Sequence, residues 1–192
     1  MARPKSFDQT AVLTGAMHAF RQHGYAGLSI RDLERATGLV AGSIYNSFGD
    51  KAGLFAAAFA HYLQAVLQQR MDTYAPTDQG LEGVRRLFTT LLEEPRNESF
   101  GCLITNTAVE FGATDVDQKN LVQAGFAMLH QALVASLIAA QRKGALRRGI
   151  DPAIGATKLV ALYQGLLVMV RAGYDKGSLR QAINFEFDAL TA

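Results

Sequence analysis

The sequence predicts an all-α protein with about nine helices. Apolar residues recur at intervals of three and four along the 192 residues, and no stretch shows the sustained alternation of a half-buried strand. Gly and Pro interrupt this pattern at spacings that suit short loops. Hydrophobic residues make up 49% of the chain, which is enough for a packed core and argues against global disorder.

Four helices are expected in the first part of the chain, at residues 7–23, 29–37, 40–46 and 50–72. Ser6 and Gln9 have the spacing of a capping box at the start of the first helix. Ser29 and Asp32 have the same spacing at the start of the second. Gly24 follows the first helix, where a left-handed residue commonly ends a helix. Apolar side chains spaced at three and four give each helix one core-facing side.

Five further helices are expected, at residues 79–93, 102–111, 116–143, 152–171 and 178–190. Asp151 followed by Pro152 has the pattern of an N-cap and a first-turn proline. Ser178 and Gln181 form another capping-box pattern. The chain therefore reads as one helical succession with two parts, residues 1–50 and residues 51–192.

Composition limits the class of protein. The longest nearly apolar run, residues 159–170, is shorter than the roughly 20 residues that span a bilayer. The first ten residues lack the apolar core of a signal peptide. A single cysteine excludes an internal disulfide framework. We therefore expect a soluble cytoplasmic protein without a membrane segment.

The net charge of +2 is concentrated near the N-terminus. Residues 1–51 hold six Lys or Arg and four Asp or Glu, whereas the remaining residues hold 13 of each. This imbalance mildly favours a polyanionic partner. Arg3 and Lys5 form a basic arm before the first helix. The arm suits insertion into a minor groove, and it equally suits a solvated tail.

The stretch GLVAGSIYNSFGDK, residues 38–51, contains a helix that is too short to be stable alone. Its apolar residues can anchor it from behind, while small polar residues face outward. Two helices joined by a glycine-containing turn, the second presenting such residues, describe a helix-turn-helix motif. Ala41 and Gly42 would let the backbone approach base pairs closely, and Ser43, Tyr45 and Asn46 can donate hydrogen bonds to DNA.

Two segments, AFRQHGYAGLSIRDLERATGL and VAGSIYNSFGDKAGLF, resemble the TetR/AcrR family of bacterial transcriptional regulators. The resemblance covers residues 12–62. It implies an all-helical homodimer with a three-helix DNA-binding head, residues 1–50, and a ligand-binding and dimerisation body, residues 51–192. It also implies double-stranded operator DNA and a small-molecule effector as partners. Repression is the usual activity in this family.

The resemblance assigns DNA-binding roles by position. Ser29, Ser43, Tyr45 and Lys51 would bind phosphates, and Val40, Ala41 and Asn46 would touch bases. Arg31 and Gly42 complete the expected interface. The sequence departs from the family where Ala41 replaces a frequent Lys or Arg, and where Asn46 replaces a frequent His. Glu34 stands where Ala is common, and if it packs beside the third helix we expect its charge to swing outward.

The body resembles the ligand-binding half of the family more weakly. GCLITNTAVEF, residues 101–111, is similar to members related to the N-ethylmaleimide-responsive repressor, in which a cysteine senses electrophiles. Cys102 therefore has two interpretations, a reactive sensor or a packed thiol. The candidate ligand-binding residues are Cys102, Asn106, Glu110, Phe126, His130, Tyr163 and Leu167.

Two apolar stripes are expected to form the dimer interface. The first contains Gly155, Ala156, Leu159, Tyr163, Leu166 and Val170, and the second contains Ile183, Phe187 and Leu190. Burial of these stripes within one chain is the alternative.

The sequence also bears on two other classes of function, an enzyme and a regulator controlled by a protein partner. An enzyme using Cys102 and His130 is disfavoured, because nucleophile-elbow, P-loop and HExxH motifs are absent. Neither metal-ligand spacing nor a cofactor motif is present, so we expect neither group. A DNA-bound regulator controlled by a protein partner instead of a small molecule is the closer alternative.

Overall fold

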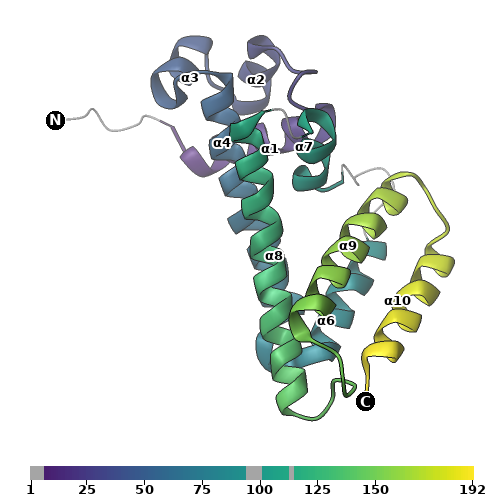
Figure 1. The fold of residues 1–192 in the computed structure, drawn as a ribbon. Helices are drawn as coiled ribbons and strands as arrows, with labels where there is room; N and C mark the ends of the chain where they lie inside the picture. The colour runs from purple at the N-terminus through teal and green to yellow at the C-terminus, as the bar shows by residue number, and fades with distance from the viewer. Residues whose placement is uncertain (1–6, 94–100, 113–114) are drawn as a thin grey trace. The chain divides into compact units, whose positions relative to one another are not determined.

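The computed structural model describes residues 7–93, 101–112 and 115–192. Arg3, Lys5 and Ser6 therefore lie outside the described residues. The helices are α1 Gln9–His23, α2 Ile30–Thr37, α3 Ala41–Phe48, α4 Lys51–Tyr62, α5 Gln69–Tyr74, α6 Gly80–Thr89, α7 Leu103–Phe111, α8 Val116–Arg142, α9 Pro152–Arg171 and α10 Lys176–Leu190 (Figure 1). In the described part, the β-structure is one isolated bridge between Leu146 and Thr191. The all-α prediction is confirmed.

The chain forms two compact units. The first contains the described residues of Met1–Val66 together with Leu103–Val122, and the second contains Leu67–Cys102 and Gln123–Ala192. Helix α8 contributes its first residues to one unit and the remainder to the other. The functional division at residue 50 stays a prediction, because compactness does not report which segment binds a partner.

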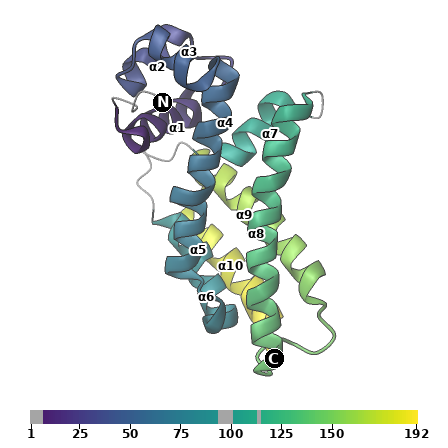
Figure 2. The same cartoon turned by 90° about the vertical axis from the view of Figure 1, so that its left-hand side faces the viewer.

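The core of the first unit forms where α1 packs against α2 and α4 (Figure 2). The buried face of α1 contains Val12, Ala16, Ala19 and Phe20, as the helical spacing predicted. The Phe20 and Phe55 rings meet edge to face with centroids 4.9 Å apart. Such an aromatic contact adds to the apolar area that the two helices bury.

The second unit packs α6 against α9 and α10. The Phe88 ring on α6 lies 5.3 Å from both Tyr163 on α9 and Phe187 on α10, measured between centroids. Figure 1 shows α9 and α10 running in opposite directions beside α6. Lys158 and Glu186 join α9 and α10 by an ion pair of 2.8 Å.

The dimer stripes predicted on α9 and α10 are buried within the second unit instead. Leu159 and Tyr163 on α9, and Ile183 and Phe187 on α10, are all almost completely inaccessible in a single chain. Helical periodicity identifies the buried side of a helix but not the partner that buries it. The residues first assigned to a dimer interface therefore belong to the internal core.

Several helix boundaries differ from the prediction. Asp8 caps α1, because its carboxylate accepts the Thr10 and Ala11 N–H groups. Asp175 caps α10, and Ser178 lies inside that helix. A nearby carboxylate competes well with serine for the exposed N–H groups of a first turn. The helix expected over residues 50–72 contains a π-helical segment, Leu63–Gln68, between α4 and α5.

Helices α8 and α9 each contain an 18-residue stretch with a mean hydropathy of 1.6, long and apolar enough to cross a membrane. This corrects the expectation that the apolar runs are too short. The signal is weak, because the core helix of a soluble protein passes the same test. On α9, Leu159, Tyr163 and Leu166 pack into the core of the second unit, as a core helix does.

Candidate nucleic-acid interface

A hydrogen-bonded capping box fixes the start of α2. The carboxylate of Asp32 accepts the Ser29 N–H at 2.8 Å and the Ser29 hydroxyl at 2.6 Å. In return, the Asp32 N–H donates to the Ser29 hydroxyl at 3.2 Å. These hydrogen bonds lower the pKa of the Asp32 carboxyl, and the paired Arg35 guanidinium lowers it further. A phosphate contact by the Ser29 hydroxyl would therefore compete with Asp32.

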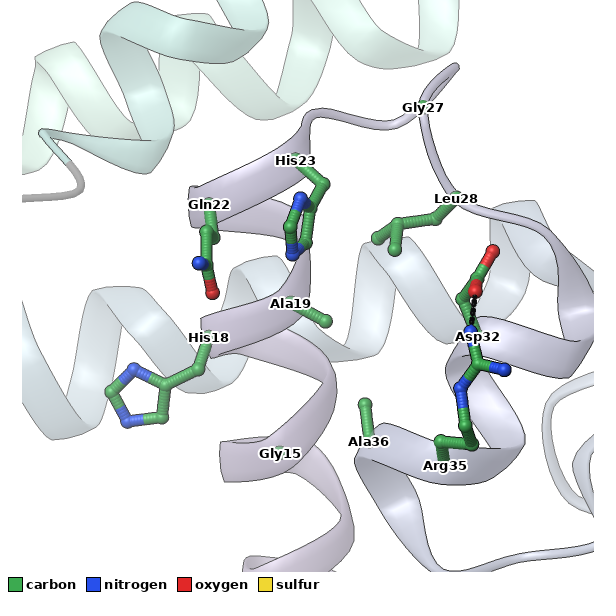
Figure 3. Close-up of a pocket in the computed structure, with 10 residues that line it drawn as sticks. All are labelled: Gly15, His18, Ala19, Gln22, His23, Gly27, Leu28, Asp32, Arg35 and Ala36. Atoms are coloured by element: carbon green, nitrogen blue, oxygen red, sulfur yellow. Dashed lines mark hydrogen bonds and ion pairs between the residues drawn. The ribbon is translucent and has the colours of Figure 1, made fainter.

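A crevice of about 570 Å³ lies between α1 and α2 (Figure 3). The Asp32–Arg35 ion pair borders it on the α2 side, and His18 on α1 points away from α2. Burial, followed by the positive charge of Arg21, lowers the pKa of His18. In the described part of the chain, no three His, Cys, Asp or Glu side chains are grouped to hold a metal ion.

Helix α3 presents an open face of small and polar residues. Ile44 is fully buried and anchors the helix, whereas Val40, Gly42, Tyr45 and Asn46 are exposed. A Cβ added to Gly42 would meet nothing within 4 Å, so this side of α3 is unobstructed. Ala41 and Ser43 are partly exposed on the same short helix, and Arg31 is exposed on α2. The residues predicted to touch bases thus lie together.

Glu34 does not swing outward as expected. Its Oε1 accepts the Ala41 N–H at 2.6 Å, at the first turn of α3. Val40, the N-cap residue of α3, provides no side-chain cap. The start of a helix carries unsatisfied N–H groups and a partial positive charge, which attract a carboxylate. Alanine, the common residue at this position, cannot make this contact, so the family pattern does not predict it.

Lys51 lies at the start of α4, but its side chain turns back onto the loop between α1 and α2. Its Nζ donates to the Leu28 carbonyl oxygen and lies 4.3 Å from the centre of the Tyr25 ring. Asp50 caps α4 by accepting the Gly53 N–H at 2.7 Å. Burial, and then the nearby Asp50 carboxylate, raises the pKa of the Tyr25 phenol. A phosphate contact by Lys51 requires its side chain to leave this position.

Comparison with known families identifies the family to which this helix-turn-helix motif belongs. Residues 12–58 match the family described as bacterial regulatory proteins, tetR family. Residues 80–185, more than half of the chain, match the tetracyclin repressor-like C-terminal domain. The chain belongs to the TetR family. It is accordingly a DNA-binding transcriptional regulator, as its sequence indicated.

Individual TetR-family proteins support this assignment. The chain is 28% identical over 182 residues to the HTH-type transcriptional repressor ComR of Escherichia coli, covering 93% of this chain and 87% of ComR. It is similar to a cysteine mutant of the TetR family regulator CifR, solved with a 26-base-pair operator DNA, with a TM-score of 0.80 and 27% identity. That match covers 97% of this chain and 99% of the CifR chain.

The fold of nearly the whole chain also resembles a further solved structure. The reduced form of E. coli NemR matches with a TM-score of 0.83 over 96% of this chain and 99% of the NemR chain. The identity is 17%, so the match concerns the fold alone.

The candidate effector residues of this TetR-family body do not form one cluster. Asn106 and Glu110 attach α7 to the end of α1 within the first unit. The Asn106 amide donates to the Arg21 carbonyl oxygen at 3.1 Å. The Glu110 carboxylate accepts the Tyr25 N–H at 2.8 Å and the Ala26 N–H at 2.6 Å. Their hydrogen bonds are structural, and the face that they share on α7 packs on α1.

Three further candidates are core residues of the second unit. Cys102, Tyr163 and Leu167 are buried, and the Tyr163 ring packs against Phe88. Burial removes the solvent access that a reactive thiol requires, so the structure favours the packed-thiol interpretation of Cys102.

Phe126 and His130, in contrast, line the same groove. They line an open, largely apolar groove of about 540 Å³ between α8 and α9, together with Thr157, Val160 and Ala161. The His130 Nε2 lies 3.2 Å from both the Ala153 carbonyl oxygen and the Thr157 hydroxyl. The α9 residues of this groove were not predicted, because the apolar spacing of that helix marks its buried stripe instead. Their spacing of three and four was the available signal.

Proposed function

We propose that this TetR-family regulator is a homodimeric transcriptional repressor that leaves its operator when an effector binds. The open face of α3 carries this proposal. A short helix is anchored by Ile44, and its outer side offers Tyr45 and Asn46 beside the bare backbone of Gly42. Such a surface allows close approach to base edges in the major groove.

Each residue of the interface has a distinct role in this proposal. Asn46 reads base edges, with Val40, Ala41 and Gly42 forming the apolar and backbone contacts beside it. The Tyr45 and Ser43 hydroxyls donate to phosphates, which fix orientation without reading sequence. Ser29, Arg31 and Lys51 add phosphate contacts, and for Ser29 and Lys51 these contacts replace the internal hydrogen bonds described above.

Two copies place their α3 helices in successive major grooves, about 34 Å apart. The exposed outer surface of α9 and α10 supplies the dimer contact. It carries Ile154, Val168 and Phe185, and the small residue Gly165 lets a second helix approach closely. Exposed apolar surface of this kind marks an interface.

The groove that contains Phe126 and His130 is the proposed effector site. Apolar walls with a few polar groups suit a small organic ligand. An effector that prefers the conformation with low DNA affinity by about 2.7 kcal/mol weakens operator binding roughly 100-fold. Helix α8 contributes both Phe126 in the second unit and residues of the first unit, so it connects the two along the chain. Relatives that regulate bacterial transcription support a cytoplasmic location.

Titrations of the purified protein test this function. The operator is first found by gel shift on DNA upstream of the protein's own gene, and a scrambled duplex of equal length serves as reference. Tyr45→Phe should weaken binding to both duplexes roughly tenfold or more through loss of a hydrogen bond to a charged phosphate. Asn46→Ala should change the sequence preference. Tyr174→Phe, which alters an exposed tyrosine in the second unit, is the matched control. Wild-type protein that binds no fragment at low salt would refute the proposal.

A further inference from the structure

The first turn of α3 takes its cap from another helix. Glu34 lies on α2, seven residues before Ala41, and its Oε1 accepts the Ala41 N–H at 2.6 Å across the turn at Gly38. The side chain of the N-cap residue Val40 has no group that can accept a hydrogen bond. Other helices of the first unit take their cap from the residue just before them, as with Asp8 for α1, Ser29 for α2 and Asp50 for α4.

A cap from α2 couples the two helices of the motif. An N-cap within the same segment would stabilise α3 wherever α3 lay. The contact from Glu34 forms only when the first turn of α3 lies within reach of this side chain, which is attached to α2. Helix α3 has eight residues and depends on its neighbours for stability.

The charge of Glu34 has a second consequence. The start of a helix attracts anions, and DNA phosphates are the anions that this surface meets. A carboxylate at that position cancels the attraction and repels phosphates of any sequence. Ala41 brings no positive charge to offset it. The exposed cations of α2 are Arg31 and Arg35, and Arg35 is already paired with Asp32.

We infer that Glu34 is a specificity-determining positioning residue of the DNA interface. Its acceptor oxygen holds α3 in register with α2, and its negative charge lowers affinity for DNA of every sequence. The positioning favours the operator over other DNA, since only the operator offers base contacts that depend on where α3 lies, whereas the repulsion lowers both affinities together. This inference rests on the proposed DNA-binding role of α3.

Two substitutions separate the acceptor from the charge. Glu34→Gln keeps an acceptor oxygen and removes the charge, so binding to operator and to scrambled duplex should both tighten, roughly two- to fivefold. Glu34→Ala removes the acceptor as well. Its ratio of operator to scrambled affinity should fall, roughly two- to thirtyfold, which is the range expected for loss of a helix cap. Glu82→Gln, the same charge change at an exposed position of α6, is the control.

Affinities are measured over a salt series, with a thermal melt of each variant. The inference is wrong if Glu34→Ala keeps the wild-type affinity ratio, or if Glu34→Gln tightens binding no more than Glu82→Gln does. Should Glu34→Ala not fold, the comparison of the two glutamine variants still decides whether the charge acts locally. Failure of the wild-type protein to bind any duplex would instead refute the DNA-binding role itself, so the two failures are distinguishable.

Discussion

Gly15 and Ala36 bring α1 and α2 into backbone contact. A Cβ added to Gly15 would lie 2.1 Å from the carbonyl oxygen of Ala36, much closer than van der Waals contact allows. Because the obstructing atom belongs to the backbone of α2, a rotamer change cannot relieve the clash. Helix α2 therefore packs this closely on α1 because residue 15 lacks a side chain.

Gly15→Ala should destabilise the protein although alanine favours helix formation. Alanine gains about 1 kcal/mol of helix propensity over glycine, but forced overpacking typically costs about 1–3 kcal/mol, and here it displaces backbone. We expect a net loss of unfolding free energy in urea denaturation followed by circular dichroism. Gly42→Ala is the control, since a Cβ there meets nothing within 4 Å. Equal or greater stability of Gly15→Ala would show that α1 and α2 are not packed this closely.

The capping box of α2 should make part of the stability dependent on pH. Hydrogen bonds from Ser29 lower the pKa of Asp32 in the folded protein. The unfolded chain therefore binds more protons than the folded one near the carboxyl pKa, and stability rises with pH there. This contribution is complete above the ordinary aspartate pKa, about 4, and is lost as the pH falls through the lowered folded pKa.

Ser29→Ala tests this dependence. Its melting temperature should be lower than that of the wild type by a constant amount between about pH 5.5 and pH 7. The difference should shrink as Asp32 becomes protonated in both proteins, below about pH 4. Thermal melts across this range measure it. A melting-temperature difference that stays constant down to about pH 3 would mean that the Ser29 hydroxyl does not lower the pKa of Asp32.

The first unit was largely predictable because its signals are local. Capping at Ser29 and Asp32, the glycine after α1 and the buried face around Phe20 all depend on residues within one or two turns. The contact between Glu34 and Ala41 was not predictable, because it depends on the spatial relation of two helices. The same holds for Glu110, whose carboxylate binds the Tyr25 and Ala26 N–H groups 85 and 84 residues away.

The structure of the body was less predictable, because apolar spacing shows which side of a helix is buried but not which other helix buries it. The stripe through Leu159 and Tyr163 was correctly identified as buried, but it faces the chain's own core. The groove at Phe126 and His130 lies beside that stripe, on the face where α9 carries Thr157 and Ala161. The groove forms where α8 lies against α9. Its lining residues are far apart in the sequence, so no local sequence pattern predicts it.

Cys102 should react slowly with thiol reagents in the native protein. Its side chain is 3% exposed, so a reagent reaches it only when the structure opens locally. An opening free energy of about 3 kcal/mol would slow labelling by a disulfide reagent roughly 100-fold relative to the urea-unfolded chain. Labelling rates with and without urea measure this. Fast native labelling accompanied by loss of DNA binding would instead restore the electrophile-sensor hypothesis.

Phe185→Glu should convert the proposed dimer into a monomer. The Phe185 side chain is 78% exposed on α10, so within one chain it contributes little to folding. If the outer surface of α9 and α10 is the dimer contact, burying a carboxylate there would cost several kcal/mol in each of two symmetric positions. The monomer would present one α3 helix, and operator affinity would fall steeply because the two heads no longer bind together.

Light scattering at micromolar concentration gives the mass, and a thermal melt confirms that the variant remains folded. Val109→Glu is the matched control, because Val109 is 81% exposed on α7 in the first unit and lies outside the proposed contact. We expect that variant to remain a dimer with unchanged operator affinity. If the Phe185→Glu variant stays dimeric, the two copies contact each other at another surface. If the wild type is monomeric, the proposal that two α3 helices bind one operator is wrong.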